Sequence, residues 1–189
     1  MQSSSLKPSG SLKITLAAAS LLLLPLTSPL RADVGEDNRA PEVPAVLQVP
    51  DGNKVLFHAY AIGVQIYTWK NISSTEFPQF AWVFKAPEAV LYDADGNVVG
   101  IHYAGPSWET ESGSKVVGAV DKRSPSPIGS IAWLLLHAVL NNGPGILDQV
   151  TYIQRVNTAG GTAGAAGSYE GEESRVPYTA EYYFYRATH

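Results

Sequence analysis

The chain of 189 residues contains no cysteine and has fewer cations than anions, with 13 Lys and Arg against 17 Asp and Glu. The lack of cysteine excludes disulfides and thiolate metal sites, so the fold must rely on its core. The net charge of -4 without a basic cluster argues against nucleic acid and anionic membrane surfaces as partners. Aromatic residues, at 10% of the chain, supply the large side chains that such a core needs.

Long hydrophobic runs are also scarce, and the one that stands out is N-terminal. Lys7 and Lys13 precede an uncharged apolar run from Ile14 to Leu26, and small residues follow up to Ala32. The run is shorter than the about 20 residues of a membrane-spanning helix. This layout predicts a secretory signal peptide over residues 1–32, cleaved after Ala32, and a secreted or periplasmic mature protein without a membrane span. The alternative is an uncleaved anchor.

The remaining chain has the size of one domain. Cleavage removes Lys7, Lys13 and Arg31 but no acidic residue, so the net charge falls from -4 to -7. Residues 33–50 are polar and proline-containing, which indicates an extended lead-in. Residues 51–187 are expected to form a single domain, and we expect a monomer.

Alternation of apolar and polar residues dominates this domain and predicts strands. A hairpin is expected around the turn at residues 93–97, and Gly63 is expected to introduce a bulge or a bend into the first strand. The predicted strands are Val55–Trp69, Phe80–Lys85, Ala89–Tyr92, Val98–Tyr103, Lys115–Val120, Val150–Thr158 and Tyr178–Arg186.

Two segments depart from this alternation. Ile131–Leu140 is rich in Leu and Ala, with Ser130 as a candidate N-cap, and favours a short buried helix. Residues 160–173 are rich in Gly, Ala, Ser and Glu and indicate a mobile loop. The fold class expected is therefore mainly β: a single-domain β-sandwich or barrel with one or two short helices.

Six sequence blocks, in this order, are similar to the domain of unknown function family 3455 (DUF 3455), found in bacteria and fungi. The resemblance spans about residues 50–186 and implies a family but no agreed activity. The blocks are GVQIYTW (63–69), WVFKAPEAVLYDADGNVVGIHYAGPSWE (82–109), GSKVVG (113–118), IAWLLL (131–136), VTYIQRVNTAGG (150–161) and VPYTAEYYFY (176–185).

The resemblance also implies two departures. Many relatives carry one cysteine after the QIY block and another in the loop after TGG, whereas this chain has neither. Loss of both together is what a disulfide between these regions would predict, so Trp69 is expected to lie near residues 162–168. Some fungal relatives carry a malate dehydrogenase label, but Gly160, Gly161 and Gly164 lack the G-x-G-x-x-G spacing of a dinucleotide site. The sequence therefore gives no support for an NAD-dependent dehydrogenase, and no cofactor is expected.

A corner around residues 105–107 carries the best candidates for chemistry. His102 and Glu109 are the catalytic candidates, since an imidazole can exchange protons while a carboxylate orients it. Tyr103, Ser107 and Trp108 are the candidate ligand-binding residues. The alternative is a rigid aromatic corner with a purely structural role.

Other polar residues are given structural interpretations. No histidine has metal-ligand spacing, although His58 and His102 could meet if their strands pair, and no metal is expected. His137 is interpreted as a core residue. One of Gln154 and Arg155, which alternate on a strand, is expected to be buried against a carboxylate such as Glu88 or Glu181.

Several remaining signals are weak or ambiguous. The Asp93–Asn97 segment lacks the closing Glu of a calcium loop and is interpreted as a turn, and neither Ser107 nor Ser114 lies in a nucleophile motif. Tyr178, Tyr182 and Phe184 share one face of the last strand, and Tyr183 and Tyr185 share the other. One set should be core, and the other, if exposed, would be a platform for a sugar or a peptide.

The preferred function is a non-catalytic module that binds a glycan or small molecule. The alternatives are a small hydrolase-like or other enzyme that uses His102 and Glu109, and a structural envelope protein without a ligand. Exposed aromatics in a groove would favour binding, a hydrogen bond between His102 and Glu109 in a polar cleft would favour catalysis, and a convex surface without a pocket would favour a structural role.

Overall fold

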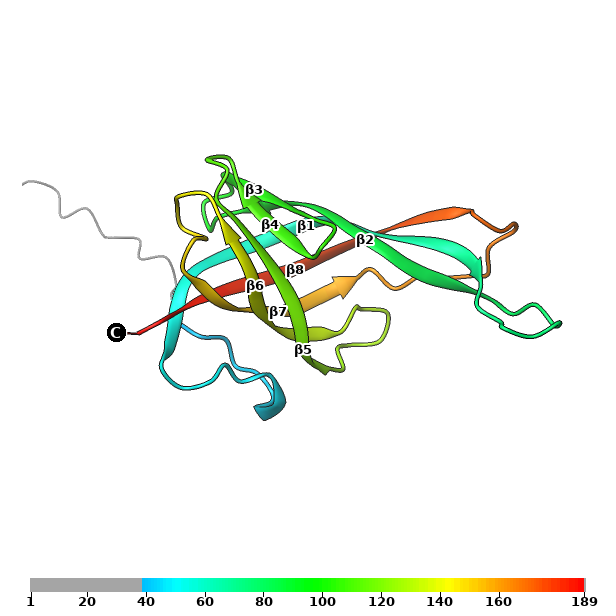
Figure 1. Cartoon of the computed structure of the whole chain (residues 1–189), viewed down its shortest axis with the longest axis horizontal. Coiled ribbons are helices and arrows are strands. Elements are labelled where there is room, and N and C mark those ends of the chain that lie inside the picture. The colour runs from blue at the N-terminus through cyan, green and yellow to red at the C-terminus, as the bar shows by residue number, and fades with distance from the viewer. Residues whose placement is uncertain (1–38, 189) are drawn as a thin grey trace, which may run out of the picture. The chain divides into compact units, whose positions relative to one another are not determined.

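The computed structural model describes residues 39–188, which form a closed barrel of eight antiparallel strands. Each strand pairs with its neighbours in sequence, and the first strand pairs with the last (Figure 1). The mainly-β fold is confirmed, and it is a barrel rather than a sandwich. The strands are β1 (Asn53–Asn71), β2 (Phe80–Tyr92), β3 (Val98–Tyr103), β4 (Ser107–Thr110), β5 (Lys115–Ser124), β6 (Trp133–Asn142), β7 (Val150–Gly160) and β8 (Glu173–Ala187).

Small and large side chains share the interior of the barrel. Ala59, Ala61 and Ala180 lie on the inner faces of β1 and β8, and leave room for the aromatic rings of Phe57 and Phe184, which stack with centroids 5.5 Å apart. This alternation of small and large inward residues is how narrow barrels fill their lumen.

β1, β2 and β8 are the three longest strands. They continue together beyond the other strands, toward the right of Figure 1. Of the bulge or bend predicted at Gly63, the bulge is wrong, because Gly63 pairs regularly with Ala89 and Tyr178. A Cβ on Gly63 would lie 2.5 Å from the Ala89 Cβ, so glycine here permits close approach of two strands. The irregularity in the β1–β2 ladder falls at Ile66 and Tyr67 instead.

The predicted helix over Ile131–Leu140 is also wrong, because β6 occupies Trp133–Asn142. Leu134, Leu135 and Leu136 are all buried although successive strand residues point to opposite faces. A strand covered on both faces has no alternation, and its continuous apolar run cannot be distinguished from a buried helix by periodicity. Within residues 39–188 the only helix is a 3₁₀ turn, η1 (Ala45–Leu47).

The lead-in covers part of the outside of the barrel. Val43 and Val49 pack against a buried outer cluster that includes Val55, Val156 and Tyr185. The carbonyl of Leu47 accepts a hydrogen bond from the buried Gln154 side chain at 2.7 Å. The predicted signal peptide lies outside the described residues.

The expected neighbours of Trp69 are confirmed. A Cβ on Gly167 would lie 2.6 Å from Cγ of Trp69, so the loop before β8 passes directly against this indole. The nearby Trp82 ring nitrogen donates to the carbonyl of Ala165 at 2.7 Å. Packing against Trp69 and a side-chain hydrogen bond from Trp82 therefore hold this loop next to the position after the QIY block, as the missing cysteines predicted.

Candidate functional site

The interior of the barrel contains a cavity of about 690 Å³, within the range of sites for small molecules. All eight strands contribute residues to its wall, and the loops after β3, before β6 and after β7 contribute the rest. Its lining residues are Gln65, Tyr67, Phe84, Lys85, Pro87, His102, Ala104, Gly105, Pro106, Trp108, Val120, Arg123, Ser130, Ile131, Ala132, Leu134, Leu136, Arg155, Thr162 and Tyr182.

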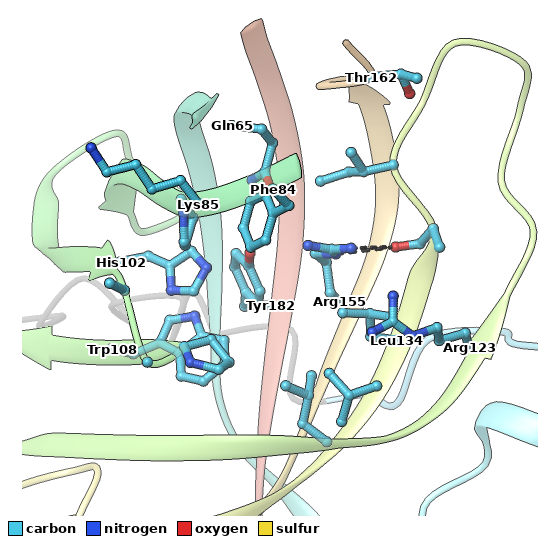
Figure 2. A pocket seen from close by; sticks show the side chains of 18 of the residues that line it. Gln65, Phe84, Lys85, His102, Trp108, Arg123, Leu134, Arg155, Thr162 and Tyr182 are labelled. Atoms are coloured by element: carbon cyan, nitrogen blue, oxygen red, sulfur yellow. Dashed lines mark hydrogen bonds between the residues drawn. The ribbon is translucent and has the colours of Figure 1, made fainter. Parts of the chain in front are cut away.

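An aromatic cluster forms one wall of this cavity. His102 stacks on Trp108 with centroids 4.6 Å apart and an interplanar angle of 12°, and the Tyr182 ring lies 5.0 Å from His102. All three side chains are almost completely buried. Figure 2 shows His102 above Trp108, with Tyr182 beside them. The cluster continues into the core, where Trp108 meets Phe184 edge to face.

His102 is held as a neutral imidazole. Its Nδ1 lies 2.8 Å from the carbonyl oxygen of Ser107, and since a carbonyl can only accept, this bond assigns the ring proton to Nδ1. Burial, opposed by the Ser107 hydrogen bond and assisted by the nearby Arg155 charge, lowers the pKa of His102 to about 3. Nε2 is therefore left with an unprotonated lone pair at neutral pH.

The structure does not bring His102 and Glu109 together. His102 is directly opposite Trp108 in the β3–β4 ladder, and Glu109, one residue further along β4, points to the other face. Glu109 instead accepts a hydrogen bond from the hydroxyl of Tyr103 at 2.5 Å, and the ammonium of Lys115 lies over the Tyr103 ring. The predicted corner is therefore divided between two faces of the sheet.

Of the candidate site residues, His102 and Trp108 line the cavity, whereas Tyr103, Ser107 and Glu109 do not. Ser107 is buried beside the turn, where its carbonyl orients His102. The signal that could have separated these residues is the two-residue period of the strand, which places 102 and 108 on one face and 103 and 109 on the other.

Arg155 lies next to Tyr182 in the β7–β8 ladder, across the cavity from His102 and Trp108. One of Gln154 and Arg155 was expected to be buried against a carboxylate. That expectation is wrong, because Nε and Nη2 of Arg155 donate to the carbonyl of Ala132 at 3.1 and 2.8 Å (Figure 2). Glu88 pairs with Arg175 and Glu181 with His58. Gln154, on the opposite face of β7, is buried and bonded to Leu47 and Tyr185.

Several buried polar atoms near the cavity lack a hydrogen-bond partner. These atoms are the side-chain nitrogens of Gln65 and Trp108 and the hydroxyls of Tyr178 and Tyr182. Burial raises the pKa of both tyrosines, while the nearby Arg155 charge acts in the opposite direction. Gln65, Tyr178 and Tyr182 neighbour one another, yet none of these atoms reaches hydrogen-bonding geometry. Buried polar groups in proteins are nearly always paired, so these atoms mark where an additional polar group fits.

His58 and His137 do not line the cavity. The interpretation of His137 as a core residue is wrong. It lies on β6 with a partly exposed side chain, whose Nδ1 is 2.7 Å from the carboxylate of Asp121. His58 and His102 do not meet, because β1 pairs with β2 and β8 whereas β3 pairs with β2 and β4. Residues 39–188 contain no group of three or more side chains suited to hold a metal ion.

Two further sequence interpretations can be compared with the structure. Asp93 caps the β2–β3 turn by accepting main-chain hydrogen bonds from Asp95 and Asn97, as a turn residue should. The buried Ser114 hydroxyl accepts a hydrogen bond from the Leu147 amide and so ties two loops together. In the part of the chain from 39 to 188, no helix has the length and hydropathy required to cross a bilayer.

Comparison with known proteins identifies the family. No curated protein and no solved structure gave a match to the chain. A family of proteins of unknown function matches residues 50–186, which cover the barrel from the residues before β1 almost to the end of β8. The chain therefore belongs to the family described as protein of unknown function (DUF3455).

Proposed function

We propose that this protein is an exported, non-catalytic module that binds a small molecule inside its barrel. The observation that carries the proposal is the cavity of about 690 Å³, with a buried wall of His102, Trp108 and Tyr182. Apolar and aromatic surface would supply affinity, and the unpaired polar atoms of Gln65, Trp108 and Tyr182 would orient the ligand. A cavity set within the barrel wall fits a small molecule better than a glycan chain, which needs an extended surface groove.

The environment of His102 supports binding over acid–base catalysis. A pKa of about 3 makes its imidazole a weak base at neutral pH, far from the pKa near the working pH that suits a general base. Glu109, which would have oriented it, is bonded to Tyr103 on the other face of the sheet. The buried stacking of His102 on Trp108 is instead suited to shape a flat binding wall.

Export is the second part of the proposal and rests on the N-terminal sequence. Lys7, Lys13 and the apolar run Ile14–Leu26 support delivery to the periplasm or the medium. N-terminal sequencing of the mature protein should begin within a few residues of Asp33. Recovery of chains with intact Met1 from the soluble cytoplasm would contradict export.

Binding inside the barrel can be tested with N-phenyl-1-naphthylamine, a neutral probe whose fluorescence rises in apolar sites. We expect a saturable increase with the parent protein. Val120→Trp should abolish it, because Val120 lines the cavity yet is 37% exposed, so a larger ring can enter without repacking the core. Ile101→Trp is the matched control, since Ile101 is exposed on the outside of β3.

Both tryptophan variants should keep the far-UV circular dichroism spectrum of the parent. The proposal is contradicted if the parent gives no saturable increase, or if Val120→Trp binds the probe as well as Ile101→Trp does.

A further inference from the structure

We propose that the ligand of this cavity is a small anion with a flat apolar body, whose acidic group binds Arg155 and Arg123. The inference rests on the proposed function and adds the chemical class of the ligand. It follows from four features of the cavity: a partly buried guanidinium without a counterion, a second guanidinium on the same side, the absence of acidic lining residues, and the stacked rings of His102 and Trp108 on the other side.

Arg155 is the first feature. Its side chain is only partly exposed and has no carboxylate within 4 Å among residues 39–188. Its guanidinium donates to the carbonyl of Ala132, and the neutral hydroxyl of Tyr182 lies beside it. That carbonyl engages Nε and Nη2, so Nη1 remains available to a ligand. A partly buried guanidinium normally has an anionic partner, because a neutral carbonyl offsets only part of the cost of desolvating the charge.

The charge of Arg155 extends across the cavity. It opposes protonation of His102 and favours ionisation of Tyr67 and Tyr182, and therefore acts on three residues of the lining. The charge of Arg155 therefore acts on this part of the lining, although the chain as a whole carries a net charge of -4. An acidic group placed there would meet attraction that the acidic exterior does not offer.

Arg123 is the second guanidinium. It lies on β5, lines the cavity and is exposed, and its side chain makes no hydrogen bond or ion pair with any residue from 39 to 188. Figure 2 shows Arg123 and Arg155 on the same side, with Leu134 beside them. The third cation of the lining, Lys85, is bonded to Glu173 and is already neutralised.

The composition of the remaining wall completes the assignment. None of the lining residues is Asp or Glu, so an anion meets no repulsion from a carboxylate of the wall. Across the cavity from the two arginines, His102 and Trp108 present a stacked pair of rings. Tyr182, the cross-strand neighbour of Arg155, lies between the two sides, and the cavity-lining Phe84 is half exposed. A ligand that spans these walls needs an acidic group at one side and a flat apolar body at the other.

A pair of fluorescent probes tests this polarity. 1-Anilinonaphthalene-8-sulfonate and N-phenyl-1-naphthylamine share one aromatic skeleton, and only the first carries an acidic group. We expect the parent protein to bind the sulfonate at least about 10-fold more tightly than the neutral probe, as a charge-assisted hydrogen bond implies. Val120→Trp should lose both probes.

Substitutions show which arginine binds the sulfonate group of the probe. Arg155→Met should weaken sulfonate binding about 10-fold to 100-fold and leave the neutral probe within about 3-fold. Arg155→Lys should retain most of the sulfonate affinity, although it also loses the bidentate contact with Ala132, and so separates charge from structure. Arg123→Gln, at an exposed position that tolerates substitution, should weaken the sulfonate about 3-fold to 10-fold.

Lys122→Gln is the matched control, because Lys122 is exposed on the same strand, one residue away, and does not line the cavity. It should change the affinity for the sulfonate less than about 2-fold. Equal affinity for the two probes, or equal losses in Lys122→Gln and Arg123→Gln, would overturn the anionic ligand but leave cavity binding intact. Failure of the parent to bind either probe would overturn both the inference and the proposed function.

Discussion

The two faces of β8 carry the same residue type in opposite situations. Tyr183 and Tyr185 face outward, and their hydroxyls donate to Glu181 and Gln154 at 3.1 and 2.5 Å. Tyr178 and Tyr182 face inward, and their hydroxyls have no hydrogen-bond partner. All four side chains are buried. Burial alone therefore does not distinguish the two faces of β8. The hydrogen-bond pairing of the buried hydroxyls does.

The outer face is completed by the protein itself. The lead-in packs over it through Val43 and Val49, and Leu47 accepts from the Gln154 amide that also binds Tyr185. The inner face meets the cavity instead. This difference supports the assignment of the barrel interior, and not the aromatic exterior, as the surface for a ligand.

The largest expected change in stability comes from Trp108, whose indole lies between the cavity and the core. Trp108→Ala should lower the free energy of unfolding by about 3–5 kcal/mol, because the indole is fully buried against His102, Tyr182 and Phe184. Urea unfolding measures the loss. Trp69→Ala, which removes a less buried indole near the end of β1, should lower the free energy of unfolding by a smaller amount. An equal loss would show that the interior wall is not the better-packed region.

The next effect is the pH dependence that His102 introduces. Its folded pKa of about 3 lies below the ordinary 6.5, so only the unfolded chain takes up a proton between these values. Its contribution to stability should therefore be complete above pH 6.5 and decline by about 1.4 kcal/mol per pH unit as the pH falls toward 3.

Urea unfolding at several pH values from 7.5 to 4 tests this dependence. His102→Gln should give a shallower decline than the parent, whose other histidines are unchanged in the variant. Parallel curves for the two proteins would show that His102 is protonated in the folded state, and that the inner face is more hydrated than its burial indicates.

The smallest effect tests the two faces directly. Tyr185→Phe should lower the free energy of unfolding by about 1–2 kcal/mol, because it leaves the buried oxygen of Gln154 without its donor. Tyr182→Phe removes a hydroxyl without a partner, so the change should stay within about 0.5 kcal/mol. Chemical unfolding of the two variants and the parent provides the measurement. A greater cost for Tyr182→Phe than for Tyr185→Phe would reverse the comparison.

The strand positions were predictable wherever one face of a strand is buried and the other is not. Val98–Tyr103 matches β3, and Val150–Thr158 lies within β7, because alternation survives in these segments. Prediction failed where both faces are covered, as at Leu134–Leu136, and where a strand is short, as in β4, which appeared as part of a corner. Gly63 showed that a glycine in a strand can reflect close packing instead of a bulge.

The site was predictable only in part, because it is assembled from strands far apart in the sequence. His102 and Trp108 were found because they are six residues apart and flank one turn. Gln65 and Arg155, from β1 and β7, carry no local pattern that marks them as neighbours of His102. The position of Arg155 across the cavity from His102 and Trp108 depends on barrel closure, which no short-range sequence pattern indicates.

The seam between β1 and β8 determines how this chain can acquire its shape. Asn53 pairs with Ala187, and the Thr188 amide donates to the Gly52 carbonyl, so both ends of the barrel sequence leave it at one place. A barrel joined through its first and last strands has high contact order and can close only after nearly the whole domain is available. The same adjacency means that the chain need not start at β1. A circular permutant with a short linker between residues 188 and 52, and with new ends in the exposed loop at Ile128, would preserve all eight strand pairings.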